Sequence, residues 1–255
     1  MKLVLGTLTL CAFFGSALSP TSPTTSFGPA PASGALVTAS PGEVGSVKGK
    51  ALFQGEAPRR RKVDMGSDPA CHALHAEDAR DESVIVGEKG ELANVFVWVS
   101  KGLEGKEFAL PTTPAELDQK GCTYVPHVLG MRVGQKLVIK NADPVTHNVH
   151  SFAKKNKAFN QSQQGGGKSL EQVFDKEEVL MQVKCDIHGW MSTYVGVVAH
   201  PYFAVTKADG AFEIPGLAPG EYTLSAKHEV FGTQKTAITV KVDGVVETAF
   251  TFAEE

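Results

Sequence analysis

Short apolar runs separated by turn residues cover the chain from about residue 45 onward. Between residues 45 and 53, apolar and polar residues alternate, which is the period of a half-buried strand. Similar apolar runs recur at residues 92–99, 137–139, 180–183, 194–198, 212–214, 222–224 and 237–242. Glycine, proline and aspartate turn signals separate the later runs. Many short strands with frequent turns predict an all-β fold, built as a sandwich.

Three stretches do not follow the strand pattern. Residues 70–80 predict a short helical turn, and residues 161–168, which contain three consecutive glycines, predict a loop. Residues 18–44 are rich in Pro, Ser, Thr, Ala and Gly and contain almost no large apolar side chains. Such a segment cannot bury enough surface to offset its chain entropy, so we expect a disordered tether, with ordered structure from about Gly45.

The N-terminus has the pattern of an export signal. Lys2 is followed by an apolar stretch and then by small residues, with cleavage expected after Ala17. The apolar stretch is too short to span a bilayer, and no later segment is long and apolar enough to do so. We therefore predict a signal peptide over residues 1–17 and a periplasmic or secreted protein. Lipid anchoring through Cys11 is the alternative, although Leu10 stands where a lipoprotein signal has a small residue.

The charge balance argues against a nucleic-acid partner. The formal net charge is -3 over 255 residues, whereas nucleic-acid-binding domains carry a strongly basic face. The single basic run, residues 59–62, is short, and we interpret it as a solvated loop.

Side chains with the chemistry of metal ligands gather at two places in the chain. Cys185, His188 and Met191 have the spacing C-x-x-H-x-x-M, and His147 lies in a second stretch upstream. Two imidazoles, one thiolate and a weak axial thioether form the ligand set of a blue-copper electron-transfer site. Each residue alone is more often structural than metal-binding. Together the four predict one mononuclear copper ion.

Residues 124–198 resemble the cupredoxins, in particular the amicyanin-like and plastocyanin-like blue copper proteins. The resemblance rests on the context of His147, on the C-x-x-H-x-x-M loop, and on residues 131–139, which are similar to the family's V-x-V-G-D-x-V strand pair. It implies a Greek-key β-sandwich with a type 1 copper, in which Asn148 orders the ligand loop and the imidazole edge of His188 passes the electron. Trp190 is either an aromatic residue for partner docking beside that edge or a packing residue.

The ligand loop departs from the family at two positions. Asp186 stands where the family often has a small hydroxyl residue, and Ile187 replaces a common proline. Neither change removes a ligand, so the resemblance still implies copper, while a carboxylate next to Cys185 is expected to lower the reduction potential or to change the partner surface.

A second resemblance covers the two ends of the predicted β region. Residues 45–49 have the form G-x-V-x-G, and residues 204–224 are similar to the second half of a carboxypeptidase-regulatory-like (transthyretin-like) domain. This resemblance implies a smaller β-sandwich formed by residues 45–105 and 200–255, with the cupredoxin, residues 106–199, inserted between them. The alternative is two consecutive domains, with residues 45–105 adding strands to the cupredoxin.

The cysteine count leaves one question open. Of the four cysteines, three remain after removal of Cys11, and an odd thiol in an exported protein needs an explanation. If Cys185 binds copper, Cys71 and Cys122 are left to form a disulfide. The other interpretation places them, with residues 72–75, in a second metal site.

These observations predict an exported electron carrier with one type 1 copper and a redox protein as its partner. Copper storage or delivery is the first alternative, and a structural or adhesion module is the second. We do not expect an enzyme, because multicopper oxidases and copper nitrite reductases use His-x-His pairs for further copper ions, and this sequence contains none.

Overall fold

The computed structural model describes residues 43–75 and 79–254. The predicted signal peptide, Cys11 and nearly all of the predicted tether lie outside the described residues. Within them the chain forms strands and a single short helix, α1 (Pro69–His75), which confirms the all-β prediction. None of the helical structure in this part of the chain is long and apolar enough to cross a membrane.

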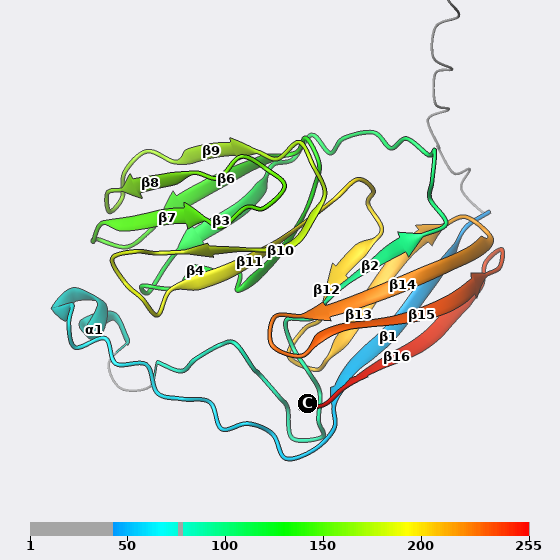
Figure 1. Ribbon diagram of the computed structural model, residues 1–255, viewed down its shortest axis with the longest axis horizontal. Coiled ribbons are helices and arrows are strands. Elements are labelled where there is room, and N and C mark those ends of the chain that lie inside the picture. Colours follow the sequence, from blue (N-terminus) through cyan, green and yellow to red (C-terminus); the bar gives the residue numbers. More distant parts are fainter. Residues whose placement is uncertain (1–42, 76–78, 255) are drawn as a thin grey trace, which may run out of the picture. The chain divides into compact units, whose positions relative to one another are not determined.

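Strands from both ends of the described chain form one pair of sheets. A three-stranded sheet has the order β13 (Ala211–Leu217), β1 (Gly45–Phe53) and β16 (Val245–Phe252). A four-stranded sheet has the order β12 (Phe203–Val205), β2 (Phe96–Lys101), β14 (Gly220–His228) and β15 (Gly232–Val240). The strands of both sheets are labelled in Figure 1.

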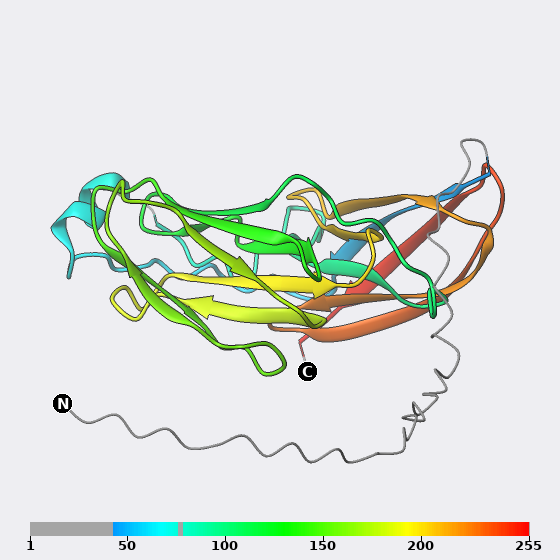
Figure 2. The same ribbon diagram turned by 90° about the horizontal axis from the view of Figure 1, so that it is seen from above.

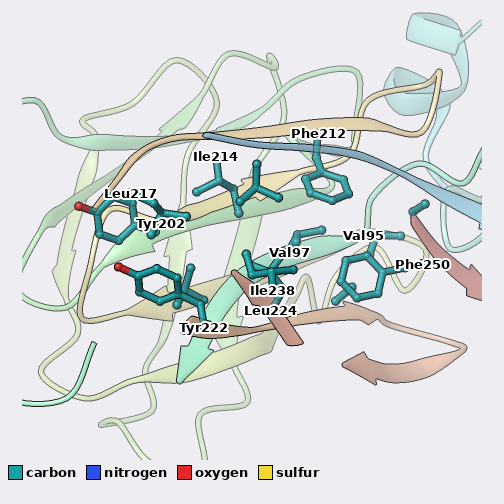
Figure 3. Packing of buried hydrophobic residues seen from close by; sticks show 14 of the residues in the cluster. Val95, Val97, Tyr202, Phe212, Ile214, Leu217, Tyr222, Leu224, Ile238 and Phe250 are labelled. Atoms are coloured by element: carbon teal, nitrogen blue, oxygen red, sulfur yellow. The ribbon is translucent and has the colours of Figure 1, made fainter. Parts of the chain in front are cut away.

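The apolar faces of these two sheets enclose one core. Alternate residues of β1 are buried, as the period-2 pattern predicts, and they meet aromatic and aliphatic side chains of the opposite sheet. Figure 3 shows Ile214 and Phe212 from the first sheet facing Val97, Leu224 and Ile238 from the second.

The strands in the middle of the chain form the second pair of sheets. A five-stranded sheet has the order β5 (Val128–Arg132), β11 (Ser192–Val198), β10 (Glu178–Lys184), β7 (His147–Ser151) and β8 (Asn160–Gln163). A four-stranded sheet has the order β4 (Tyr124–Val125), β3 (Ala115–Gln119), β6 (Lys136–Asn141) and β9 (Leu170–Val173). Leu117 and Ile139 from one sheet and Val183 and Val195 from the other are buried in their common core.

A third apolar cluster contains residues from both pairs of sheets. Phe96 of β2 is fully buried and packs with Val128, Leu180 and Val198. The sheet assignments follow the predicted chain segments, but they do not establish domain boundaries, so the division into domains stays a prediction.

The segment between β1 and β2 contains α1, which lies against the pair of sheets formed by β3 to β11. We call residues 63–75 the strap. A disulfide joins Cys71 of α1 to Cys122, which lies just before β4, so the disulfide interpretation of this cysteine pair is confirmed. Both views agree that α1 lies beside one end of the β3–β11 strands (Figures 1 and 2).

Two local predictions differ from the structure. Part of the predicted loop 161–168 belongs to β8, because its backbone pairs with β7 at the edge of the sheet, where exposed polar side chains are tolerated. The predicted strand at residues 92–99 begins only at Phe96, since Leu92 forms an isolated bridge to Val86 instead of joining β2. The helical turn expected at residues 70–80 is α1, which ends at His75.

Candidate metal centre

The four predicted ligands lie at one end of the β7–β10–β11 part of the five-stranded sheet. His147 is the first residue of β7, Cys185 follows the last residue of β10, and His188 and Met191 precede β11. The pairing of Lys184 with His150 sets the register of β7 against β10, and this register brings His147 beside the ligand loop. All four side chains are buried, with no more than 3% of any residue exposed.

Three of the four ligand groups converge on one point. Nδ1 of His147 lies 2.9 Å from Nδ1 of His188, and Sγ of Cys185 lies 3.8 Å from the same His188 nitrogen. The three ligand atoms all lie within 4.8 Å of one another. Soft thiolate and borderline imidazole donors at such separations are the chemistry that suits copper.

The two Nδ1 atoms provide the strongest test of whether a cation fits. Nε2 of each histidine faces an aspartate carboxylate, which requires the Nε2 proton and leaves Nδ1 with a lone pair in a neutral ring. Two lone pairs 2.9 Å apart repel each other unless a proton or a metal ion is shared by them. The residues present therefore fit a bound metal cation.

Met191 is tied to the same loop through its backbone. Its N–H donates to the carbonyl of His188 over 2.9 Å, and its carbonyl accepts from the Cys185 N–H over 3.2 Å. The side chain belongs to the apolar cluster that also contains Cys185 and Val149. Its role as an axial ligand stays a prediction.

The sulfur of Cys185 accepts two backbone hydrogen bonds. The N–H groups of Asn148 and His188 each lie 3.3 Å from Sγ. Such donors stabilise negative charge on a thiolate and tune a metal site. The Asn148 side chain also links β7 to the ligand loop, because its Oδ1 accepts from the Asp186 N–H over 3.0 Å.

Asp143 holds the outer nitrogen of His147. Its Oδ2 lies 2.8 Å from His147 Nε2, and its two oxygens accept the backbone N–H groups of Gly121 and Cys122. Burial lowers the pKa of His147, and the hydrogen bond to Asp143 opposes that shift. Sequence reasoning did not assign Asp143, although it lies only four residues before His147 in the same polar stretch.

Asp68 of the strap holds the outer nitrogen of His188 in the same way. Its Oδ2 lies 3.1 Å from His188 Nε2, and Sγ of Cys71 lies 3.7 Å from that nitrogen. The backbone hydrogen bond from Cys71, followed by the side-chain bond with His188, keeps the pKa of Asp68 below its usual value. No local signal in the sequence pointed to Asp68, which is separated from His188 by 120 residues.

The imidazole edge of His188, which the family resemblance implies as the route of the electron, is buried. His188 is only 3% exposed, because Asp68 and Cys71 cover its outer nitrogen. The cover comes from the strap, 120 residues away in the chain, and the role of this edge as the electron route stays a prediction. The exposed residues of the ligand loop are Asp186, Ile187 and Gly189.

Trp190 lies next to the covered edge. Its ring centroid is 5.0 Å from that of His188, and its Nε1 donates to the carbonyl of Cys122 over 3.0 Å. The side chain packs partly buried against the core of this pair of sheets. The partner-docking role of Trp190 stays a prediction, and these contacts supply a packing role.

His150, three residues after His147, lies outside this centre. His150 is bonded through Nδ1 to the carboxylate of Asp186 over 3.1 Å and stacks on Phe152. The carboxylate of Asp186 also accepts a hydrogen bond from the Asn160 side chain. Both hydrogen-bond partners of this carboxylate, His150 and Asn160, therefore lie at the surface, and the carboxylate does not bond to Cys185.

Comparison with known proteins gives partial structural similarity. No protein-family model matches the chain, and the comparison with curated proteins finds no match. A Cu-containing nitrite reductase (NirK) from Thermus scotoductus SA-01 is 22% identical, with 35% of this chain and 23% of that chain covered and a TM-score of 0.32. This chain therefore spans less than a quarter of the reductase.

Two smaller copper proteins give similar values. A purple cupredoxin from Nitrosopumilus maritimus is 28% identical, covers 32% of this chain and 98% of its own, and has a TM-score of 0.29. A reduced mutant of amicyanin is 20% identical, with 34% and 85% covered and a TM-score of 0.31. Each similarity concerns about a third of this chain.

Proposed function

We propose that this protein is a mononuclear type 1 copper protein that transfers electrons, with His147, Cys185, His188 and Met191 as the copper ligands. The observation that carries the proposal is the convergence of two Nδ1 atoms and one Sγ within 4.8 Å in a buried site. His147 lies 38 residues before Cys185 and 41 residues before His188, so their convergence is a property of the fold.

The donor set fits copper better than other common metals. A thiolate and two imidazoles suit both oxidation states of copper, and a thioether in the same loop adds a weak soft donor. Bound copper would supply a one-electron couple between Cu(II) and Cu(I).

The protein residues hold the ligands in place before the metal arrives. Asp143 and Asp68 fix the ring orientation and the tautomer of the two histidines through Nε2. The Asn148 and His188 N–H groups stabilise the thiolate form of Cys185. Burial of the whole set excludes water, and a rigid dry site needs little rearrangement when an electron arrives or leaves.

The cellular setting is part of the proposal. A disulfide between Cys71 and Cys122 supports export to an oxidising compartment, periplasmic or extracellular, since such bonds persist there. We assign the electron donor and acceptor to other redox proteins. The two pairs of sheets support a cupredoxin over residues 106–199 and a second β-sandwich over residues 45–105 and 200–255.

We place the protein among carriers and not among enzymes. The three groups of possible metal ligands in the described part of the chain all include His147 or His188, so they surround a single centre. Copper storage or delivery is the second candidate function. The cover over His188 favours it, because an outer imidazole edge that is only 3% exposed offers a poor direct contact for a redox partner.

The test is the visible spectrum of the protein after addition of Cu(II). An intense thiolate-to-copper charge-transfer band is expected, and C185S should abolish it. H150Q serves as the matched control, because it removes a nearby histidine that lies outside the ligand set. A colourless wild-type protein, or a band that survives in C185S, would refute the assignment.

A second measurement separates the two candidate functions. A reversible one-electron couple in voltammetry, with copper retained in the presence of a competing chelator, supports electron transfer. Rapid loss of copper to the chelator without a stable couple supports storage or delivery.

A further inference from the structure

We propose that Asp68 is a positioning residue for the copper ligand His188, and that the strap serves to deliver it. The inference rests on the proposed copper site and identifies a part of that site that lies 120 residues from the ligand it controls.

The surroundings of the two histidines are alike. His188 Nε2 faces Asp68 and Cys71, while His147 Nε2 faces Asp143, beside which Cys122 lies. The two cysteines are the two halves of one disulfide. Each histidine therefore lies next to one carboxylate and one sulfur of the Cys71–Cys122 disulfide. The strap supplies the carboxylate and the sulfur that lie next to His188.

The hydrogen bond decides which nitrogen of His188 is free to bind a metal. A carboxylate accepts but does not donate, so the proton must lie on Nε2 and the lone pair on Nδ1. Nδ1 is the atom that lies 3.8 Å from Cys185 Sγ and 2.9 Å from His147 Nδ1. Without the carboxylate, only Sγ of Cys71, a weak acceptor 3.7 Å away, would face Nε2 from the strap.

Asp68 uses its two oxygens for two different tasks. Oδ1 accepts the N–H groups of Ala70 and Cys71 at the start of α1, whereas Oδ2 alone faces His188. An asparagine can keep the first task with its oxygen and then presents an NH2 group, a donor, to the Nε2–H of His188. D68N therefore alters the contact with His188 and preserves the local turn.

The strap is held against the site independently of Asp68. The Cys71–Cys122 disulfide fixes α1, and Met65 and Cys71 are buried in the core that contains the metal ligands. The disulfide and the core packing therefore hold the Asp68 carboxylate next to His188, even without the hydrogen bond between them.

The experiment uses the full protein loaded with Zn(II), which is diamagnetic and takes the same imidazole and thiolate donors. NMR follows the Nε2 protons of His147 and His188 and their exchange with solvent. In the wild type both protons should be slowly exchanging. In D68N the His188 proton should exchange much faster, while the His147 proton serves as the internal reference and does not change.

Two further variants complete the design. D64N changes an exposed aspartate of the same strap and should leave both protons as in the wild type. D143N should affect the His147 proton and not the His188 proton. Zn(II) affinity, measured by chelator competition, should fall about 10- to 100-fold in D68N and less than twofold in D64N.

Several outcomes would overturn the proposal. These are an unchanged His188 proton and affinity in D68N, or an equal loss of protection at both histidines, which indicates a general structural role. If D68N does not fold, the wild type decides alone, because a His188 proton that exchanges as fast as free imidazole contradicts the hydrogen bond. The two proposals can fail separately. If Cu(II) gives no blue band but D68N shows the expected changes in proton exchange and Zn(II) affinity, the copper function is refuted and the positioning role of Asp68 still holds.

Discussion

The Cys71–Cys122 disulfide closes a loop of 51 residues and anchors the strap over the candidate metal centre. The double variant C71S/C122S removes this covalent link and leaves two small side chains in its place. In the chain-entropy description, opening a loop of that length lowers the free energy of unfolding by about 4 kcal/mol at 25 °C. Both cysteines are fully buried, so the new hydroxyl groups add a further unfavourable contribution.

The variant should also release the strap before the whole protein unfolds. Asp68 would then lose its fixed position beside His188. Residues 59–62, which precede the strap and are already largely exposed, would be cleaved faster by trypsin because the chain that follows them is no longer held. Guanidinium unfolding followed by tryptophan fluorescence measures the global loss, and the rate of trypsin cleavage at residues 59–62 measures local opening. Zn(II) affinity of the same samples reports on the site.

The wild type with its disulfide reduced is the matched comparison, because it breaks the same bond without changing a residue. It should behave like the double variant, and reductant should have no effect on that variant. A loss below about 1 kcal/mol together with unchanged trypsin cleavage would refute the reasoning that the disulfide holds the strap in place.

Two further predictions concern residues away from the metal centre. Burial lowers the pKa of His228 to about 4 from 6.5, and its Nε2 finds no hydrogen-bond partner among the described residues. Because the folded state resists protonation, stability is full above about pH 6.5 and falls as the pH drops towards 4, by up to about 3 kcal/mol. Urea unfolding across this range should show a smaller slope in H228Q than in the wild type, while His147 and His200, whose pKa values burial also lowers, continue to contribute. Equal slopes in the two proteins would contradict the prediction. Gly196 faces Phe96, whose ring carbons would lie 2.6 Å from an added Cβ, so G196A should cost about 1–3 kcal/mol. Thermal unfolding measures that cost, the copper band should be unchanged, and a neutral G196A would contradict the packing.

Local sequence patterns were sufficient to predict the strands and the candidate metal ligands. Period-2 alternation and turn residues predicted the strands, since side chains of a strand point alternately to the two faces of its sheet. The four candidate ligands were also found from the sequence, because a thiolate, two imidazoles and a thioether in two short motifs are chemically distinctive. The position of loop 161–168 was misjudged, since pairing with β7 and not local composition decides that β8 is a strand.

Tertiary structure alone decided what surrounds those ligands. An aspartate in a polar loop gives no sign of its hydrogen-bond partner when 120 residues of chain intervene, and so Asp68 and the cover over His188 were not predicted. The pairing of Cys71 with Cys122 was left open for the same reason, because composition allows a disulfide or a metal site and only proximity chooses. The sequence by itself determined the all-β class and the donors available for a metal. The fold determined which nitrogen of each histidine faces inward, because that choice depends on where two carboxylates come to lie: Asp143 in the loop before β7, and Asp68 in the distant strap.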